Sequence, residues 1–424
     1  MSTRDWVKTT FGEICTITRG ASPRPIMDWV SSAGTPWVKI SDATGEPGRF
    51  ISQTKEFIKN EGRSKSVVVY PGDLVVSNSA TPGLPKFLRI EACVHDGWLL
   101  LRNFKGALPE FLYYVVLNDR KTLVGKGSGS VFTNLKTEIL KNHEIALPEI
   151  PEQKRISDTL GQLDDLIALN VAVSKTLEDL AQTIFKSWFV DFDPVKAKMA
   201  GEKPAGMDDA TAALFPDSME ESELGLIPKG WEARQLKSAL VLHKSTIKAG
   251  TATESVPYVP IDQIGSRDIF LKNSMSGSEA KTSLVSFEKN EILFGAMRPY
   301  FHKVALAPFD GTTRTTTFVL RAINPRYLAF SLLTVFQDSA VAYATNHSQG
   351  TTIPYAVWNN SFENYPLVFP SESVATAFND LVLPLIEYGY SLVKENQKLV
   401  QLRNGLLPRL ISGELQIPDE MLAS

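Results

Sequence analysis

The residue types that most often carry chemistry are present in this 424-residue chain, but not at catalytic spacings. The glycine-rich, basic turn GKGSGS (125–130) lacks the order Gly-x4-Gly-Lys-Ser/Thr that a phosphate-binding loop requires. No paired carboxylates or activated nucleophile stand out. The five histidines show no metal-ligand spacing with cysteine, aspartate or glutamate; they are His95, His143, His243, His302 and His347. The sequence therefore favours a binding and positioning protein over an enzyme.

Two further motifs have alternative interpretations. The tetrapeptide NPRY (Asn324–Tyr327) resembles the Asn-Pro-Pro-aromatic signature of adenine methyltransferases only superficially, and it favours the opening of a helix with proline in its first turn. The stretch QTIFKSWFVDFDP (Gln182–Pro194) holds four large aromatic residues. They form either the buried end of one helix or a docking seam, within the chain or with another protein.

The composition is that of a globular protein, with 43% hydrophobic and 9% aromatic residues. The first twenty residues contain Asp5 and Glu13 where a signal peptide needs an apolar core, and the longest apolar run, Tyr327–Phe336, is too short to span a bilayer. Two cysteines, Cys15 and Cys93, are too few for a disulfide framework or a metal cluster. We therefore expect a cytoplasmic protein with no membrane partner.

The net charge of −3 hides an alternation along the chain. Residues 1–150 and 226–370 each carry a net charge of +4, whereas residues 151–225 carry −8 and residues 371–424 carry −3. Two mildly basic blocks thus alternate with two acidic ones. The near-neutral sum does not exclude nucleic acid as a partner, because the basic blocks can act separately.

The chain repeats itself with a period of about 220 residues. Matching pieces follow one another in the same order: Trp6 with Trp231, Thr35–Asp42 with Val256–Gln263, Gly72–Val76 with Asn290–Phe294, Ile145–Pro148 with Leu367–Pro370, and Leu177–Phe185 with Leu399–Leu407. Within each copy, strand patterns at 66–70, 98–101 and 315–320 mix with short helical patterns at 109–118 and 325–344. The sequence thus predicts an α+β fold with an internal repeat.

Each copy ends in a long amphipathic helix. Apolar residues recur every three or four positions over 156–188 and 378–410, while Pro384 and Gly389 should weaken or kink the first turns of the second helix. We expect the helices to pack as a long antiparallel, coiled-coil-like pair separating two similar domains; alternatively, each helix packs only on its own domain. The predicted order is a first domain (1–150), first long helix (151–190), acidic linker (191–225), second domain (226–370), second long helix (371–415) and C-terminal tail (416–424).

Four motifs at the junctions of this order resemble the specificity subunits of type I restriction-modification systems. They are LPEIPEQKRI (Leu147–Ile156), IFKSWFVDFDPVKAK (Ile184–Lys198), GLIPKGW (Gly225–Trp231) and GLLPRLISGEL (Gly405–Leu415). The first copy departs from the pattern because Trp6 lacks the Pro-x-Gly that precedes Trp231. The second copy departs at Ser371–Val374, which replaces the Glu-Gln that begins the first helix.

The resemblance implies two target recognition domains, each reading one half of a split double-stranded DNA sequence, joined by helices that set the spacer. It also implies that two modification (methyltransferase) subunits dock on those helices and that restriction (motor-nuclease) subunits join the complex. S-adenosylmethionine, ATP and Mg are then expected in the partner subunits. In this chain we expect no cofactor, no metal and no catalytic residue.

DNA affinity comes largely from lysine and arginine on phosphates, and specificity comes from contacts with base edges. The candidate DNA-binding residues lie in short polar or basic segments of both domains: Arg19, Arg24, Ser77, Asn78, Arg120, Lys121, Lys126, Lys244, Lys248, Arg298, Tyr300, Lys303 and Arg314. Arg298 and Lys303 rank highest because they share a short loop with aromatic residues.

The candidate residues of the helix pair or partner seam are apolar: Phe185, Trp188, Phe189 and Phe192, opposite Leu406, Leu407 and Leu410. Phe185 and Trp188 should close the helix pair, whereas Phe189 and Phe192 should dock a methylating partner. The main rival function is a scaffold or adaptor whose two domains bind proteins, without sequence-specific DNA binding. A second rival is an enzyme that acts alone on DNA, which methyl transfer or cleavage by the isolated chain would reveal.

Overall fold

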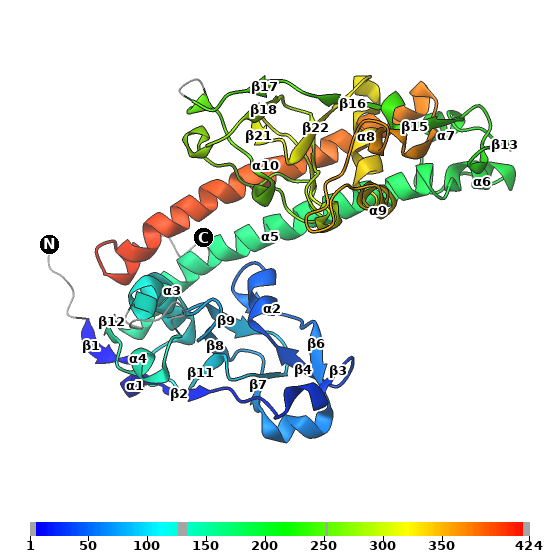
Figure 1. Ribbon diagram of the computed structural model, residues 1–424. Coiled ribbons are helices and arrows are strands. Elements are labelled where there is room, and N and C mark those ends of the chain that lie inside the picture. Colours follow the sequence, from blue (N-terminus) through cyan, green and yellow to red (C-terminus); the bar gives the residue numbers. More distant parts are fainter. Residues whose placement is uncertain (1–5, 126–133, 251–252, 419–424) are drawn as a thin grey trace. The chain divides into compact units, whose positions relative to one another are not determined.

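The computed structural model describes residues 6–125, 134–250 and 253–418 of the chain. It separates into two compact units, of which unit 1 comprises residues 1–171 and 396–424 and unit 2 comprises residues 172–395 (Figure 1). Within these described residues, no helix is long and apolar enough to cross a bilayer. Each unit combines a sheet-rich block with parts of two long helices.

Unit 1 contains two five-stranded sheets. The central sheet has the strand order β2-β11-β8-β9-β5, and its pairs are antiparallel except for β5 with β9. The apolar run of β11, WLLL, is buried throughout, as expected for a strand covered on both faces. The strands are β2 (Thr16–Arg19), β11 (Trp98–Arg102), β8 (Leu74–Ser77), β9 (Pro85–Leu88) and β5 (Phe50–Ile51).

The second sheet of unit 1 has the order β3-β6-β4-β10-β7, and a separate antiparallel pair joins β1 to β12. Its strands are β3 (Val30–Ser31), β6 (Glu56–Ile58), β4 (Thr35–Val38), β10 (Ala92–Val94) and β7 (Val67–Val69), and the pair is β1 (Val7–Thr10) with β12 (Glu144–Leu147). The shorter helices are α1 (Phe11–Ile14), α2 (Ile40–Gly45), α3 (Pro109–Gly125) and α4 (Thr137–Lys141).

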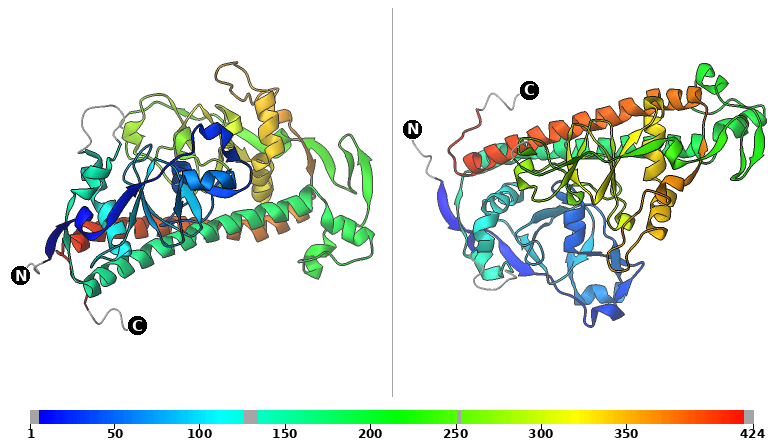
Figure 2. Two further views of the ribbon diagram at one scale, coloured as in Figure 1. Left: turned by 90° about the horizontal axis from the view of Figure 1, so that it is seen from below. Right: turned by 45° about the horizontal axis from the view of Figure 1, so that its top comes forward.

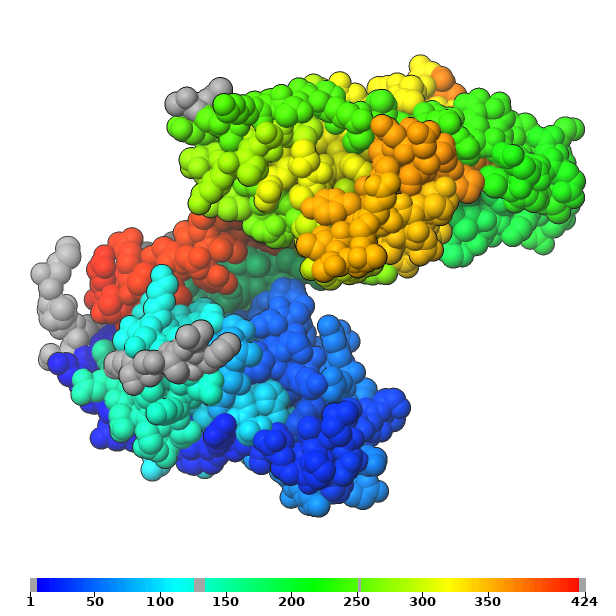
Figure 3. Space-filling view, in the orientation of Figure 1, coloured from blue at the N-terminus to red at the C-terminus, as the bar shows by residue number. Residues whose placement is uncertain are grey.

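Unit 2 has a four-stranded central sheet, β16-β22-β19-β20, and a three-stranded sheet, β17-β18-β21. In the space-filling view its elements, coloured from green to orange, form one continuous body (Figure 3). The strands are β16 (Leu240–His243), β22 (Thr317–Ala322), β19 (Ile292–Gly295), β20 (Val304–Leu306), β17 (Thr246–Ile247), β18 (Leu284–Phe287) and β21 (Gly311–Arg314). The helices beside them are α8 (Leu328–Phe336) and α9 (Asp338–Asn346).

The strand order confirms the internal repeat. The series β2-β11-β8-β9 in unit 1 corresponds to β16-β22-β19-β20 in unit 2, with antiparallel pairing at each step. The pair β1-β12 likewise corresponds to β15 (Glu232–Gln235) with β23 (Pro366–Phe369). The predicted α+β class is therefore confirmed, and equivalent positions can be compared between the units.

The two long helices are α5 (Ile150–Phe189) and α10 (Glu372–Ile411), which lie side by side within each unit (Figure 2). In unit 1, Asn170 Nδ2 lies 3.0 Å from Asn396 Oδ1, and Asp164 Oδ1 lies 2.6 Å from Arg403 Nη1. From the first contact to the second, the residue number decreases along α5 and increases along α10, so the two helices are antiparallel in this unit. In unit 2, the end of α5 likewise meets the beginning of α10 through the rings of Phe185 and Phe378.

The helix α10 is continuous through Pro384 and Gly389, the two residues that were expected to weaken or kink its first turns. Pro384 is exposed, so water can satisfy the carbonyl that its missing N–H leaves without a partner. Gly389 is buried, and a Cβ at this position would lie 2.2 Å from Cζ of Phe270. The glycine therefore permits close packing rather than a kink.

The acidic segment 191–225, which follows α5, contains regular structure. It forms α6 (Asp193–Met199), α7 (Asp209–Ala213) and β13 (Met219–Ser222), which pairs antiparallel with β14 (Gly225–Pro228). Phe215, beside α7, packs edge-on against Trp188 at a centroid distance of 5.0 Å. This segment therefore adds to the core of unit 2.

Candidate functional site

In unit 1, three loops meet at one end of the central sheet. The loop after β2 is joined to the start of β11 by a hydrogen bond from Gly20 N to Trp98 O of 2.9 Å. The loop after β8 is joined to the turn before β11 by a bond from Asn78 N to Gly97 O of 2.8 Å. Candidate DNA-binding side chains that lie far apart in the sequence are thereby brought close together.

Asp96, in the turn before β11, is the centre of this group. Arg19 Nε donates to the Asp96 carbonyl oxygen at 2.7 Å, and Arg24 Nη2 lies 3.3 Å from Asp96 Oδ2. Ser22 Oγ donates to Asp96 Oδ1 at 2.7 Å, and Asn78 Nδ2 donates to the Asp96 carbonyl at 2.9 Å. The Ser22 hydrogen bond, with the nearby Arg24 charge, lowers the pKa of the Asp96 carboxyl group.

This arrangement holds two guanidinium groups at the surface. The side chains of Arg19 and Arg24 are 58% and 73% exposed, so most of their donors face solvent. A guanidinium group presents several donors in a fixed fork that suits phosphate oxygens and the O6/N7 edge of guanine. With Asp96 ionised, the three groups carry one net positive charge. The site can bind an anionic, hydrogen-bonding ligand, and no acid-base or nucleophilic chemistry follows from it.

The other predicted residues of unit 1 are placed differently. Ser77 is fully buried and its hydroxyl donates to Thr81 O at 2.5 Å, and Asn78 is only 5% exposed. The prediction that these two residues face DNA is therefore wrong: Ser77 shapes a turn, and Asn78 holds the turn at Asp96. Arg120 Nε donates to Pro82 O at 2.9 Å, which fixes α3 against the loop after β8. Lys121 is exposed on α3. Lys126 lies outside the described residues.

Unit 2 brings the equivalent three loops together. The loop after β19 is joined to the turn before β22 by a bond from Ala296 N to Thr316 O of 2.9 Å. Lys244 follows β16, and Arg314 ends β21 immediately before the turn that corresponds to the Asp96 turn of unit 1. Both side chains are exposed, as is Lys248 beyond β17. The predicted basic residues of unit 2 therefore gather at the same end of the sheet as Arg19 and Arg24 in unit 1.

The loop after β19 has an unusual backbone. Arg298 and His302 adopt left-handed conformations with φ of 52° and 51°, and they flank a short 3-10 turn, Pro299–Phe301. Tyr300 and Phe301 project from this turn and are 50% and 47% exposed. Their ring centroids are 4.8 Å apart. Two aromatic faces and a cationic side chain thus share one short, exposed turn.

His302 anchors this loop in the protein. Its side chain is buried, and its ring lies 4.8 Å from the ring of Phe336. Its Nδ1 lies 3.2 Å from Asp338 Oδ1, without the geometry of a hydrogen bond. Burial, together with the nearby Arg267 charge, lowers the pKa of His302, so the neutral ring is favoured.

Lys303 is bonded inside the protein. The prediction that it is a DNA-binding cation ranked with Arg298 is therefore corrected. Its Nζ donates to Ile261 O at 2.9 Å and to Ile264 O at 2.6 Å, and burial lowers its pKa. In unit 1, Lys86 on β9 makes a similar contact from a different position along the strand, donating to Glu46 O at 2.7 Å and to Gly48 O at 2.6 Å. Each unit therefore has a lysine that ties a loop to the central sheet.

The predicted seam residues belong to the cores. Phe185, Trp188 and Phe189 are buried in the core of unit 2, and Phe192 packs against the same cluster in a left-handed conformation. In unit 1, Leu407 and Leu410 are buried in a cluster with Ile156 and Leu160, and Leu406 packs against it. The two sets thus belong to different clusters, so the predicted apposition is wrong: in an antiparallel pair the end of one helix meets the beginning of the other.

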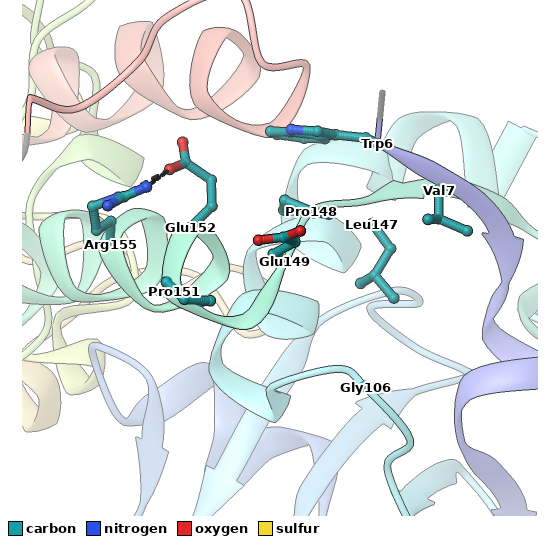
Figure 4. Close-up of a pocket in the computed structure, with 9 residues that line it drawn as sticks. All are labelled: Trp6, Val7, Gly106, Leu147, Pro148, Glu149, Pro151, Glu152 and Arg155. Carbon is teal, nitrogen blue, oxygen red and sulfur yellow. Dashed lines mark hydrogen bonds and ion pairs between the residues drawn. The ribbon is translucent and has the colours of Figure 1, made fainter. Parts of the chain in front are cut away.

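A second concave feature lies where α5 begins in unit 1 (Figure 4). It has a volume of about 530 Å³ and is lined by Trp6, Pro148, Glu149, Glu152 and Arg155, among others. Glu152 Oε2 accepts from Arg155 Nε at 2.9 Å. Its two carboxylates make it a poor site for phosphate, unlike the loop end of the sheet.

Sequence reasoning missed three residues at the loop ends. Asp96 and Ser22 complete the arginine cluster, and Phe301 doubles the aromatic surface beside Tyr300. The only sequence signal for Asp96 is its place in the turn-forming dipeptide Asp-Gly. Ser22 lies two positions before Arg24 in the sequence, and Phe301 directly follows Tyr300.

Comparison with known proteins identifies relatives over nearly the whole chain. A family model described as type I restriction modification DNA specificity domain matches residues 3–179. The chain is 24% identical to the specificity subunit of the type I restriction enzyme MjaIX from Methanocaldococcus jannaschii, covering 98% of this chain and 95% of the relative. It is 22% identical to the HindI specificity subunit from Haemophilus influenzae, covering 97% and 100%. A crystal structure of a type I restriction-modification S subunit from M. genitalium shares the fold, with a TM-score of 0.54, 14% identity and 96% of each chain covered.

Proposed function

Because the chain belongs to the family of type I restriction-modification specificity subunits, we propose that it is the non-catalytic DNA-recognition subunit of such an enzyme. Each unit reads one half of a bipartite double-stranded target. The long helices set the spacer between the halves and dock the adenine methyltransferase subunits. The chemistry then resides in two modification subunits, with S-adenosylmethionine, and in restriction subunits, with ATP and Mg.

This proposal rests on one observation: in both units, basic side chains lie where three loops meet at one end of the central sheet. Arg19 and Arg24 in unit 1, and Lys244 and Arg314 in unit 2, occupy the same three-loop end of equivalent sheets. Basic side chains on a fixed sheet edge can bind phosphates, while their loops vary to contact bases. Two such surfaces in one chain suit a target with two separated halves.

A selection experiment tests this function. The chain is assembled with the modification subunits of its own system and offered a library of randomised DNA duplexes. We expect enrichment of two conserved base blocks separated by a fixed, unconserved gap. The apparent Kd should rise steeply with salt, because neutralised phosphates release counterions.

Paired variants sharpen the test. Arg19→Ala with Arg24→Ala should relax one selected block, and Lys244→Ala with Arg314→Ala should relax the other. Lys203→Ala is a matched control, because this lysine is 62% exposed but lies in the connecting segment after α6. A folded complex that enriches no split sequence would instead favour a protein-binding scaffold, whose partner binding should depend only weakly on salt.

A further inference from the structure

The loop after β19 is held rigidly although its tip is exposed. At one side, Arg298 N donates to Pro354 O at 2.8 Å, and at the other, Gly295 N donates to Lys303 O at 2.7 Å. The Lys303 ammonium and the buried His302 ring fasten the base of the loop. The tip between them, Tyr300–Phe301, is about half exposed. Its conformation is therefore set by the protein before any ligand arrives.

The strain in this loop has no evident structural benefit. Left-handed conformations are uncommon outside glycine and asparagine, yet Arg298 and His302 both adopt one. These two residues flank the turn that exposes two adjacent aromatic rings, Tyr300 and Phe301. Backbone strain that presents apolar side chains to solvent is typical of ligand-binding loops.

The surroundings of the tip indicate its ligand. Arg298 begins the loop, and the bond between Ala296 and Thr316 places it beside the turn that follows Arg314. Cations next to exposed aromatic faces suit a polyanion that carries flat, apolar groups, which describes nucleic acid. In duplex DNA such side chains reach base faces only by entering between two stacked base pairs, and apolar wedges do so and kink the duplex.

The equivalent loop of unit 1, between β8 and β9, has no exposed aromatic pair. It contains one left-handed non-glycine residue, Ala80 with φ of 56°, and its sequence from Ser79 to Gly83 is SATPG, without an aromatic residue. The strands on either side of this loop pair alike in the two units, because β8 with β9 and β19 with β20 are both antiparallel. The two units therefore differ in this loop by the presence of an aromatic pair.

We propose that Tyr300 and Phe301 form a wedge that opens one base step in the half-site bound by unit 2, and that unit 1 leaves its half-site stacked. This inference rests on the proposed DNA-recognition function. The wedge would select sequence through the cost of unstacking a base step, in addition to the contacts made by the basic residues. Pyrimidine-purine steps are favoured because they unstack most easily. A TA, CA or TG step is therefore expected at the wedge position in one half-site only.

The test places 2-aminopurine, a base analogue whose fluorescence rises when it unstacks, at successive positions of the selected target. The full complex with its modification subunits is used, and the adenines that become methylated are left unlabelled, because methyltransferases themselves unstack their target base. We expect a rise in fluorescence at one step in one half-site. The Tyr300→Ala, Phe301→Ala double variant should lose this rise and bind the target roughly 5- to 100-fold more weakly, the effect of losing aromatic-base stacking.

Tyr70→Ala is the matched control, because this tyrosine is 48% exposed and directly follows β7 in unit 1, at the end of that strand away from the Asp96 turn. It should keep both the fluorescence rise and the affinity. A wild-type complex that binds its split target without any unstacked step overturns the wedge but leaves the DNA-recognition function intact. Unstacking that persists in the double variant, or that is equal in both half-sites, also overturns it.

Discussion

At the residue scale, Asp96 organises the arginine cluster of unit 1. Its carboxylate and carbonyl together engage Arg19, Ser22, Arg24 and Asn78, which come from two other loops. Both arginines are largely exposed, so these ion pairs add little to folding stability. Their effect is to restrict the directions in which the guanidinium groups point, and we infer that Asp96 is a positioning residue in the proposed DNA recognition.

Asp96→Asn should reduce specificity more than affinity. The amide keeps the size of the side chain but removes the charge that holds Arg24, while the net charge of the cluster becomes more positive. We expect non-specific binding to stay equal or strengthen, and the ratio of non-specific to cognate Kd to fall about tenfold, the scale of one lost base contact. Binding titrations against the selected target and a duplex scrambled in one half would measure both. Asp28→Asn, another exposed carboxylate of unit 1, is the control, and an unchanged ratio in Asp96→Asn contradicts this role.

Single residues also show where sequence reasoning stops. The exposed arginines Arg19 and Arg24 could be predicted, because loop cations beside glycine and proline are rarely buried. The correct placement of Lys303 and Ser77 could not. Their burial depends on Ile261, Ile264 and Leu84, whose proximity arises only when the strands have paired.

At the element scale, the long helices and their antiparallel pairing were predictable, but the individual residues that each helix contacts were not. The three-to-four spacing of apolar residues indicated both helices, because a buried face repeats with the helical period. Gly389 was expected to weaken or kink the helix, since glycine is unfavourable in helix interiors. Its actual role depends on Phe270, which lies in a loop of unit 2 and packs edge-on against Tyr390 at 5.1 Å. A close approach between such distant residues leaves no local pattern in the sequence.

Gly389→Ala should therefore destabilise unit 2. Alanine favours a helix over glycine by up to about 1 kcal/mol, but the added Cβ would lie 2.2 Å from the Phe270 ring, and overpacking costs about 1–3 kcal/mol. We expect a net loss of about 1–2 kcal/mol in urea unfolding. Gly405→Ala in the same helix is the control, since no atom lies within 4 Å of its added Cβ, and it should gain stability. Phe270→Leu should partly rescue Gly389→Ala; equal gains from both alanine variants would contradict the packing argument.

At the scale of the whole molecule, the repeat was the most predictable feature. Several of its short matching pieces keep their order because they form the same strand in both units, as Gly72–Val76 and Asn290–Phe294 do in β8 and β19. The segment 191–225 was less predictable, because its charge suggested a plain linker, whereas Phe215 within it packs into the core of unit 2. Both long helices continue across the boundary between the units, which falls after Val171 in α5 and after Glu395 in α10.

This continuity allows the proposed spacer function to be tested by lengthening the helices. Four residues inserted into α5 after Val171 and four into α10 after Glu395 would lengthen each helix by about 6 Å and rotate it by about 40° beyond one full turn. One base pair adds about 3.4 Å and about 34°, and two add twice as much. Rotation therefore favours one extra base pair and length favours two. We expect the gap in the selected target to grow by one or two base pairs, with both conserved blocks unchanged.

The control is the same four-residue insertion after Glu202, in the exposed turn that follows α6. It lengthens the chain without lengthening either helix, so the selected gap should stay constant. If the helix insertions yield a folded complex that selects the original gap, the helices do not set the spacer. If they change the blocks themselves, base recognition depends on how the two units are coupled, and the units do not read their half-sites independently.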